Sequence, residues 1–221
     1  GTEGLPTRIL YNMAKQLKPE LILCTQSTAF TGLECSGLLA ISETEIFERI
    51  NTNYTWFGPR NYLEAHTEFL QVVTYVCLRY RNSIAVYTRA GSGAEVRLHH
   101  LHSLGFGGHV QLSDAIHTDD ILDIPATLAH ANDREMREES VQPAVVSKEK
   151  CGLILMDDNE VSRHHAGLFE VWTLEKPELS TEDTAIANCR FMPIAQALQE
   201  RSSFESWSAA VIPFLMERYG G

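Results

Sequence analysis

Three glutamates lie close together in the run Arg134-Glu135-Met136-Arg137-Glu138-Glu139. In a helix, residues three and four apart share one face, so Glu135, Glu138 and Glu139 would present their carboxylates side by side. Like charges packed in this way destabilise a helix unless a cation lies among them, and hard divalent ions such as Mg²⁺ take oxygen ligands. The spacing therefore predicts a metal-binding helix. The alternative is an acidic face that is merely solvated.

A glycine-rich segment, Gly105-Phe106-Gly107-Gly108-His109, lies upstream of this run. Glycine has no Cβ atom, so the backbone carbonyls of such a turn can approach a ligand closely. The glycine pair, taken together with the order Arg-Glu-Met-Arg-Glu-Glu, favours a metal site over a solvated face.

The two segments together resemble the signature of the Nudix hydrolases. That signature runs glycine, five residues, glutamate, seven residues, and then Arg-Glu-apolar-x-Glu-Glu-x-Gly-apolar. With Gly108 as its glycine, Asp114 stands where the family has glutamate, and nineteen residues separate Asp114 from Arg134. An insertion of about twelve residues, roughly 115–126, is therefore expected. The usual helix-ending glycine is replaced in Ser140-Val141-Gln142.

A longer part of the chain is similar to a divergent MutT-type branch of this superfamily, known as predicted phosphoesterases. The similarity is carried by residues 89–110, by Leu168-Phe169-Glu170-Val171 and by the late Glu205-Ser206-Trp207-Ser208. It extends from about Phe57 to Leu215. The resemblance implies hydrolysis of a diphosphate that is linked to another moiety.

The resemblance also implies a role for each box residue. Glu138 and Glu139 would bind the metal directly, and Glu135 would bind a further metal or relay a proton from water. Arg134 would orient Glu135 through a charge-assisted hydrogen bond. The Gly107 carbonyl would complete the coordination sphere. The expected cofactor is Mg²⁺ or Mn²⁺.

A carboxylate outside the box is expected to complete the catalytic site. Glu170 is our first candidate for this residue, and Asp157, Asp158 and Glu160 are alternatives. An outward-facing strand position for Glu170 remains an equal alternative.

Four basic residues are candidate substrate contacts. Arg89, Arg97 and Arg163 are candidates for binding phosphate, and His109 follows the glycine pair at a position where many Nudix enzymes carry a basic residue. The remaining histidines match no zinc spacing, because no cysteine lies near them.

Composition limits the classes of partner. The chain has 221 residues, 44% of them hydrophobic, and a formal net charge of −11. The negative charge argues against a general nucleic-acid binder but allows a nucleotide-type small-molecule substrate, whose charge a metal and a few arginines can neutralise. No apolar run approaches the ~18 residues of a membrane span, so no membrane association is expected. The five cysteines are odd in number and widely spaced, which favours free thiols and a cytoplasmic protein.

The sequence predicts an α/β (α+β) fold, a Nudix α/β/α sandwich with a mixed curved sheet. We expect the Nudix domain to span residues 68–221 and an N-terminal extension, residues 1–67, to pack on it, where it could provide a homodimer contact. In the extension, residues 8–16 and 43–50 are expected to be helical and residues 21–24 extended.

In the Nudix domain, residues 71–79 and 83–89 are expected to form a hairpin, and residues 153–156, 167–174 and 187–192 three more strands. The box helix should begin near Asp123 as N-cap, with Pro125 in its first turn. A closing helix is expected from the capping-box pattern of Ser202 and Glu205.

The leading functional hypothesis is a divalent-metal-dependent pyrophosphohydrolase acting on a nucleoside diphosphate derivative. The alternative is a catalytically inactive Nudix-fold module that senses nucleotides or binds proteins. An isomerase of the isopentenyl-diphosphate type fits less well, because no cysteine–glutamate pair is identifiable. We expect the insertion at 115–126 to shape the substrate pocket, and a purely structural excursion is the alternative.

Overall fold

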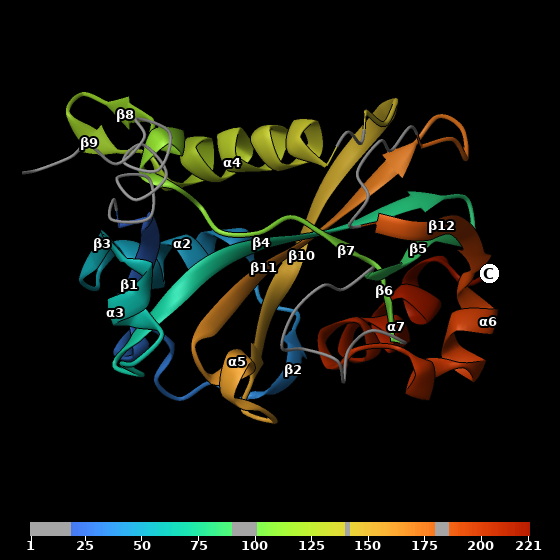
Figure 1. The fold of residues 1–221 in the computed structure, drawn as a ribbon, viewed down its shortest axis with the longest axis horizontal. Helices are drawn as coiled ribbons and strands as arrows, with labels where there is room; N and C mark the ends of the chain where they lie inside the picture. The colour runs from blue at the N-terminus through green and yellow to red at the C-terminus, as the bar shows by residue number, and fades with distance from the viewer. Residues whose placement is uncertain (1–18, 90–100, 140–141, 180–185) are drawn as a thin grey trace, which may run out of the picture.

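The computed structural model describes residues 19–89, 101–139, 142–179 and 186–221 (Figure 1). Its main feature is a sheet of ten strands whose central order is β12-β5-β4-β11-β10-β2, with β1, β3, β6 and β7 paired alongside. Strand β11 runs parallel to β4, whereas β10 and β5 are antiparallel to their neighbours, so the sheet is mixed. This confirms the predicted fold class.

The strands of the main sheet are β1 (Leu21–Gln26), β2 (Ser36–Leu39), β3 (Thr55–Pro59), β4 (Phe69–Tyr80), β5 (Ser83–Arg89), β6 (His102–Ser103), β7 (Gly105–Phe106), β10 (Val145–Met156), β11 (His165–Leu174) and β12 (Ile186–Pro193). A separate hairpin is formed by β8 (His117–Thr118) and β9 (Ile121–Leu122). The helices are α2 (Glu43–Asn51), α3 (Arg60–Leu63), α4 (Ile124–Glu138), α5 (Glu160–Arg163), α6 (Ile194–Gln199) and α7 (Ser206–Tyr219).

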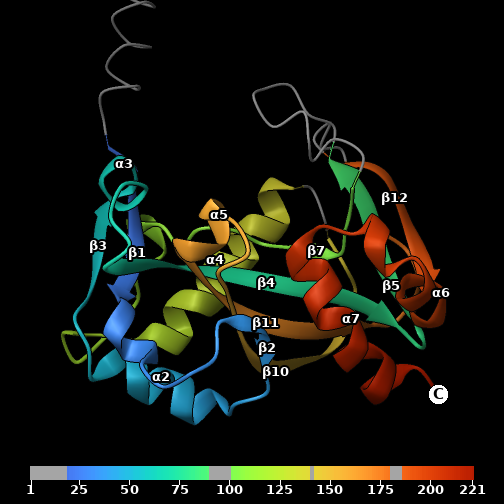
Figure 2. The same ribbon diagram turned by 90° about the horizontal axis from the view of Figure 1, so that it is seen from below.

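The sheet is covered on both faces. On one face, α2 and α4 pack on the strands through a buried cluster that includes Ile46, Leu128 and Leu168. On the other face, α6 and α7 pack through a cluster that includes Phe169 and Val211. Figure 1 shows α4 above the strands and α7 below them, and Figure 2 shows α2 and α7 towards different ends of the strands. The layers are those of the predicted α/β/α sandwich.

The predicted hairpin at the start of the Nudix region is confirmed. Strand β4 pairs antiparallel with β5, and the pairs Arg79–Ile84 and Tyr80–Ser83 lie on either side of a two-residue turn. Arg81, in this turn, has a φ of 52°. The predicted strands at 153–156, 167–174 and 187–192 are also present, as parts of β10, β11 and β12.

The helix that carries the acidic box begins where the sequence predicts. The Asp123 side chain accepts a hydrogen bond from the Ala126 backbone N–H at 3.0 Å, and Pro125 lies in the first turn. The cap satisfies one of the N–H groups that have no partner within the helix, and proline lacks the N–H that would need another.

The predicted start of the closing helix is wrong. Helix α7 begins at Ser206 with Glu205 as N-cap, and Ser202 lies in a preceding 3₁₀ turn, Arg201–Ser203. The Glu205 carboxylate accepts hydrogen bonds from the backbone N–H groups of Trp207 and Ser208, both at 2.9 Å. A carboxylate can accept from both, so Glu205 provides the N-terminal cap itself and no serine cap is needed.

Segments before residue 68 contribute strands to the same sheet as the later segments. Strand β1 pairs antiparallel with β4, β3 pairs with β1, and β2 pairs with β10. The strand expected at 21–24 and the helix expected at 43–50 are present as β1 and α2. The helix expected at 8–16 lies outside the described residues. In the described ranges, no helix is both long enough and apolar enough to cross a membrane.

Candidate active site

Arg134 is the centre of a hydrogen-bond network between α4 and the loop that precedes it. Its Nη1 donates to Glu135 Oε1 at 3.0 Å and to Glu138 Oε2 at 2.9 Å. Its Nη2 donates to the His109 carbonyl at 2.9 Å. One guanidinium therefore contacts two of the three box carboxylates and joins them to the glycine-rich loop.

Asp114 fixes this arginine from the side opposite the glutamates. Arg134 Nε donates to Asp114 Oδ1 at 2.8 Å and Nη2 donates to Oδ2 at 3.0 Å. The Asp114 side chain is only 1% exposed, and it also accepts from the Gln111 backbone N–H at 2.8 Å. These two parallel hydrogen bonds make a bidentate pair, which is the strong form of an arginine–carboxylate interaction. In this arrangement Asp114 is a partner of the arginine.

Gly107 and Gly108 each lie too close to a neighbouring group for a Cβ atom to fit without movement, but the neighbouring groups differ. Gly107 has a φ of +130°, and a Cβ atom there would lie 2.5 Å from the Thr74 carbonyl oxygen. At Gly108 a Cβ would lie 2.9 Å from Oε1 of Glu135. The Gly108 carbonyl accepts a hydrogen bond from the Thr74 N–H at 2.9 Å. The loop is thus held against β4 and packs directly on the carboxylate of Glu135.

The electrostatic environment of Glu135 is that of a crowded acidic site. Burial raises the pKa of its carboxyl group above the ordinary value, the nearby Arg134 lowers it, and the charges of Glu138 and Asp114 raise it further. Bringing a cation close to these groups would favour their charged forms.

The donors of α4 fit a hard divalent cation, because Glu135, Glu138 and Glu139 all offer carboxylate oxygens. Within the described ranges, no three acidic, histidine or cysteine side chains are already gathered at metal-binding distance. Glu138 instead contacts Arg134, and its side chain is 57% exposed. Binding a metal at all three glutamates would therefore require Glu138 to turn away from Arg134, a movement that its exposure allows.

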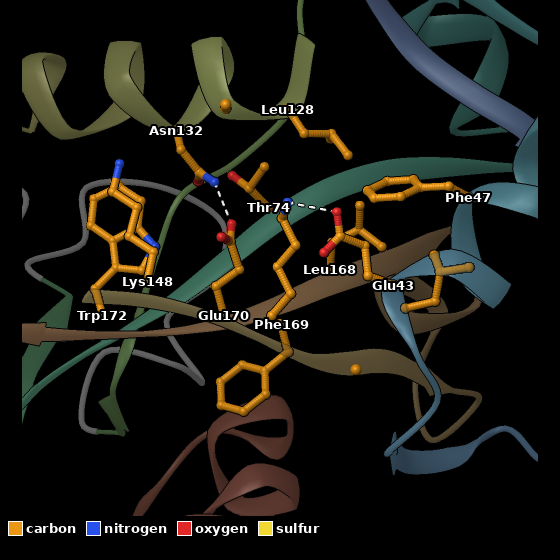
Figure 3. Close-up of a pocket in the computed structure, with 14 residues that line it drawn as sticks. Glu43, Phe47, Thr74, Leu128, Asn132, Lys148, Leu168, Phe169, Glu170 and Trp172 are labelled. Atoms are coloured by element: carbon orange, nitrogen blue, oxygen red, sulfur yellow. Dashed lines mark hydrogen bonds and ion pairs between the residues drawn. The ribbon is translucent and has the colours of Figure 1, made fainter. Parts of the chain in front are cut away.

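Glu170 lies on β11, inside a cavity between the sheet and the helices α2 and α4 (Figure 3). It is 8% exposed and accepts a hydrogen bond from Asn132 Nδ2 at 2.6 Å. Asn132 lies one turn before Glu135 on α4. The outward-facing alternative for Glu170 therefore does not describe its position, since the carboxylate points at the box helix.

His109 is not on the same side of the sheet as α4. It bridges to Val73, and its Nε2 lies 2.8 Å from Gln71 Oε1 and 3.2 Å from His165 Nε2. Side chains alternate along a strand, so Gln71 and Val73 point away from the face that Thr74 shares with α4. Burial lowers the pKa of His109 to about 3, which keeps the ring neutral. Its backbone carbonyl accepts a hydrogen bond from Arg134, whereas its ring contacts Gln71 and His165.

Of the three candidate arginines, Arg163 has a side chain in the described part of the chain, and it does not lie at α4. Arg163 is exposed on α5, where its Nε donates to the Asp157 carbonyl at 3.2 Å, and Figure 1 shows α5 at the opposite side of the sheet from α4. Arg89 ends β5, and its side chain is outside what the structure describes. Arg97 lies outside the described residues.

The insertion forms a hairpin beside the start of α4. Residues 117–122 make strands β8 and β9, joined by Asp119 and Asp120 with φ values of 51° and 61°. Figure 1 shows this hairpin at the N-terminal end of α4, and none of residues 115–126 lines the cavity around Glu170. The residues around Glu170 in the cavity wall include five that were not among the candidates from the sequence, namely Phe47, Asn132, Lys148, Lys150 and Trp172.

The chain was compared with protein-family models, curated proteins and solved structures. No family model matches the chain. Protein YmaB of Bacillus subtilis (strain 168) is 27% identical over 176 residues, which cover 77% of this chain and 82% of that protein. The solved structure of Tm1382, described as a candidate Nudix hydrolase, is similar with a TM-score of 0.74 and 21% identity, covering 90% of this chain and 99% of Tm1382.

A weaker likeness is to a bifunctional NMN adenylyltransferase/ADP ribose pyrophosphatase from Francisella tularensis. Its TM-score is 0.48 at 15% identity, covering 73% of this chain and 44% of that protein. The similarity to Tm1382, over nearly the full length of both chains, shows that this protein has the Nudix hydrolase fold.

Proposed function

We propose that this protein is a divalent-metal-dependent hydrolase that cleaves the phosphoanhydride bond of a nucleoside diphosphate linked to another moiety. The observation that carries the proposal is the Arg134 network, which holds Glu135 against the glycine loop, with the exposed carboxylate of Glu138 next to it on α4. A helix without a charged substrate or metal gains little from three neighbouring carboxylates, since like charges at this spacing repel one another.

Mg²⁺ or Mn²⁺ would be held by Glu138, Glu139 and the Gly107 carbonyl, and Glu135 would either bind a further ion or accept a proton from the attacking water. Once bound, the ion would neutralise charge on the phosphoryl oxygens and make a water molecule more acidic.

Glu135 is suited to accept a proton from the attacking water. Its pKa is raised by burial, so its carboxylate is more basic than an exposed glutamate. Arg134 is a positioning residue, because its Nη1 donates to Glu135 Oε1 and would hold that oxygen's orientation through the reaction. Asp114 in turn restrains Arg134 through two hydrogen bonds.

A panel of hydrolysis assays tests the proposal. Nucleoside triphosphates, dinucleotides and nucleotide sugars are incubated with Mg²⁺ or Mn²⁺, and products are scored as phosphate, pyrophosphate or nucleoside monophosphate. We expect metal-dependent cleavage of at least one class, and its loss in the Glu135→Gln variant. If the folded protein cleaves none of them with either metal, the proposal is wrong, and the non-catalytic nucleotide-sensing or protein-binding module becomes the better description.

A further inference from the structure

The cavity around Glu170 is a candidate binding site in its own right. It measures about 220 Å³ and lies between α4, α2 and the strands β10 and β11. Engineered apolar cavities of about 150 Å³ bind benzene, so this one has room for a planar one- or two-ring group.

Strand register places two lysines at this cavity. In the antiparallel pair of β10 and β11, Lys148 lies opposite Trp172 and Lys150 lies opposite Glu170. Directly opposed residues project on the same face, so all four side chains line the cavity. The Lys148 ammonium lies 4.0 Å from the centre of the Trp172 ring. The lysine side chains are 46% and 40% exposed, which leaves them accessible to an anion at the cavity mouth.

The interior of the cavity offers hydrogen-bond acceptors. Asn132 is 2% exposed and donates its Nδ2 to Glu170, while its Oδ1 has no hydrogen-bond partner among the described residues. A buried acceptor without a donor is costly. An N–H group of a ligand could donate a hydrogen bond to Asn132 Oδ1, and a second N–H group could donate to the neighbouring Glu170 carboxylate.

The two ends of the cavity are aromatic. Figure 3 shows Trp172 at one end and Phe47 at the other, with Asn132 and Glu170 between them. Phe47 belongs to α2, and Glu43 of the same helix forms an ion pair with Lys150 at 2.8 Å. One wall therefore comes from the chain before residue 68, outside the acidic box and its glycine loop.

We propose that this cavity binds a nitrogen heterocycle of the substrate, whose ring or exocyclic N–H groups donate to Asn132 Oδ1 and to Glu170, with an attached phosphate near Lys148 and Lys150. The inference takes the substrate class, a nucleoside phosphate, from the proposed function. The apolar walls suit a planar ring, the acceptors suit its N–H edge, and the lysines suit its anionic end. Glu170 is thereby a residue that recognises the base.

Calorimetric titration without metal tests this directly. The full chain, in EDTA, is titrated with AMP, GMP, CMP and UMP, and with ribose 5-phosphate as a probe that has the phosphate and no base. At least one nucleotide should bind about tenfold or more tightly than ribose 5-phosphate. Glu170→Gln should weaken that nucleotide about tenfold and leave ribose 5-phosphate unchanged, whereas Lys148→Met should weaken both.

Matched controls are Glu217→Gln on α7 and Lys176→Met after β11, both exposed and outside the cavity, and neither should change any affinity. Equal binding of the nucleotides and ribose 5-phosphate would overturn the inference. So would a folded Glu170→Gln variant with unchanged nucleotide affinity. Selective nucleotide binding by a protein that hydrolyses nothing would reject the proposed function and keep this site, and hydrolysis without base-dependent binding would reject the site alone.

Discussion

The change Asp114→Asn tests whether the buried pair with Arg134 holds the box in place. Asparagine has nearly the same size as aspartate, but it removes the charge and one of the two oxygens that accept from the guanidinium. Asp114 is 1% exposed and the Arg134 side chain is 13% exposed, so water can do little to replace the lost interaction.

The expected loss of stability follows from this burial. Removing one partner of a buried ion pair costs about 3–5 kcal/mol, and because asparagine keeps one acceptor we expect about 3 kcal/mol. For a chain of this size, this corresponds to a fall in melting temperature of roughly 6–12 °C. Because Arg134 also donates to Glu135, kcat should fall roughly 10- to 100-fold, with a smaller change in KM.

Thermal unfolding and steady-state kinetics of the variant measure both effects. The matched control is Asp133→Asn, the same chemical change on the same helix, at an exposed carboxylate 3.7 Å from Lys148. An exposed pair of this kind contributes about 0–1 kcal/mol, so the control should unfold within a few degrees of the wild type. If both variants have the same melting temperature and kcat, the Arg134 network does not position the box.

Two further predictions concern the loop and the cavity. Gly108→Ala should lower kcat with little change in melting temperature, because its Cβ would displace the side-chain carboxylate of Glu135 and no backbone. Gly107→Ala should lower the melting temperature, because its φ of +130° and the Thr74 backbone leave no room for a Cβ atom. Similar melting temperatures for the two variants would contradict this. Burial raises the pKa of Glu170, so its charged form destabilises the folded state at neutral pH, and this cost is relieved as pH falls through the raised pKa. Melting temperatures measured from pH 7 to pH 4 should therefore be higher for Glu170→Gln than for the wild type at pH 7, and the difference should shrink towards pH 4. A difference independent of pH would refute the raised pKa of Glu170.

Local chemistry made the framework around α4 predictable. The Asp123 cap, Pro125 in the first turn and the carboxylate spacing are all readable within a few residues. The Arg134–Glu135 contact could be anticipated because the two residues are adjacent. Asp114 and Arg134 are twenty positions apart, and the geometry of the hairpin between them was not predicted. The sequence could therefore not show whether Asp114 is a metal ligand or a partner of the arginine.

The cavity was less accessible to sequence reasoning because five separate elements build it, namely α2, β4, α4, β10 and β11. Lys148 and Lys150 alternate with the period of a strand, a signal that they share one face. Their position opposite Trp172 and Glu170 depends on the β10–β11 register, which includes a bulge between Lys150 and Gly152. The wall formed by α2 depends on how the segment before residue 68 packs, which no local pattern specifies.

A metal site on α4 is tested most directly by calorimetric titration of Mn²⁺ into the wild type, Glu138→Gln and Glu139→Gln, with Glu217→Gln as an exposed control on α7. Glutamine keeps the size of glutamate and removes the charge that a hard cation requires. We expect both box variants to bind Mn²⁺ at least about tenfold more weakly than the wild type and the control, with each variant still folded. Unchanged Mn²⁺ affinity in both box variants would contradict a metal site on α4.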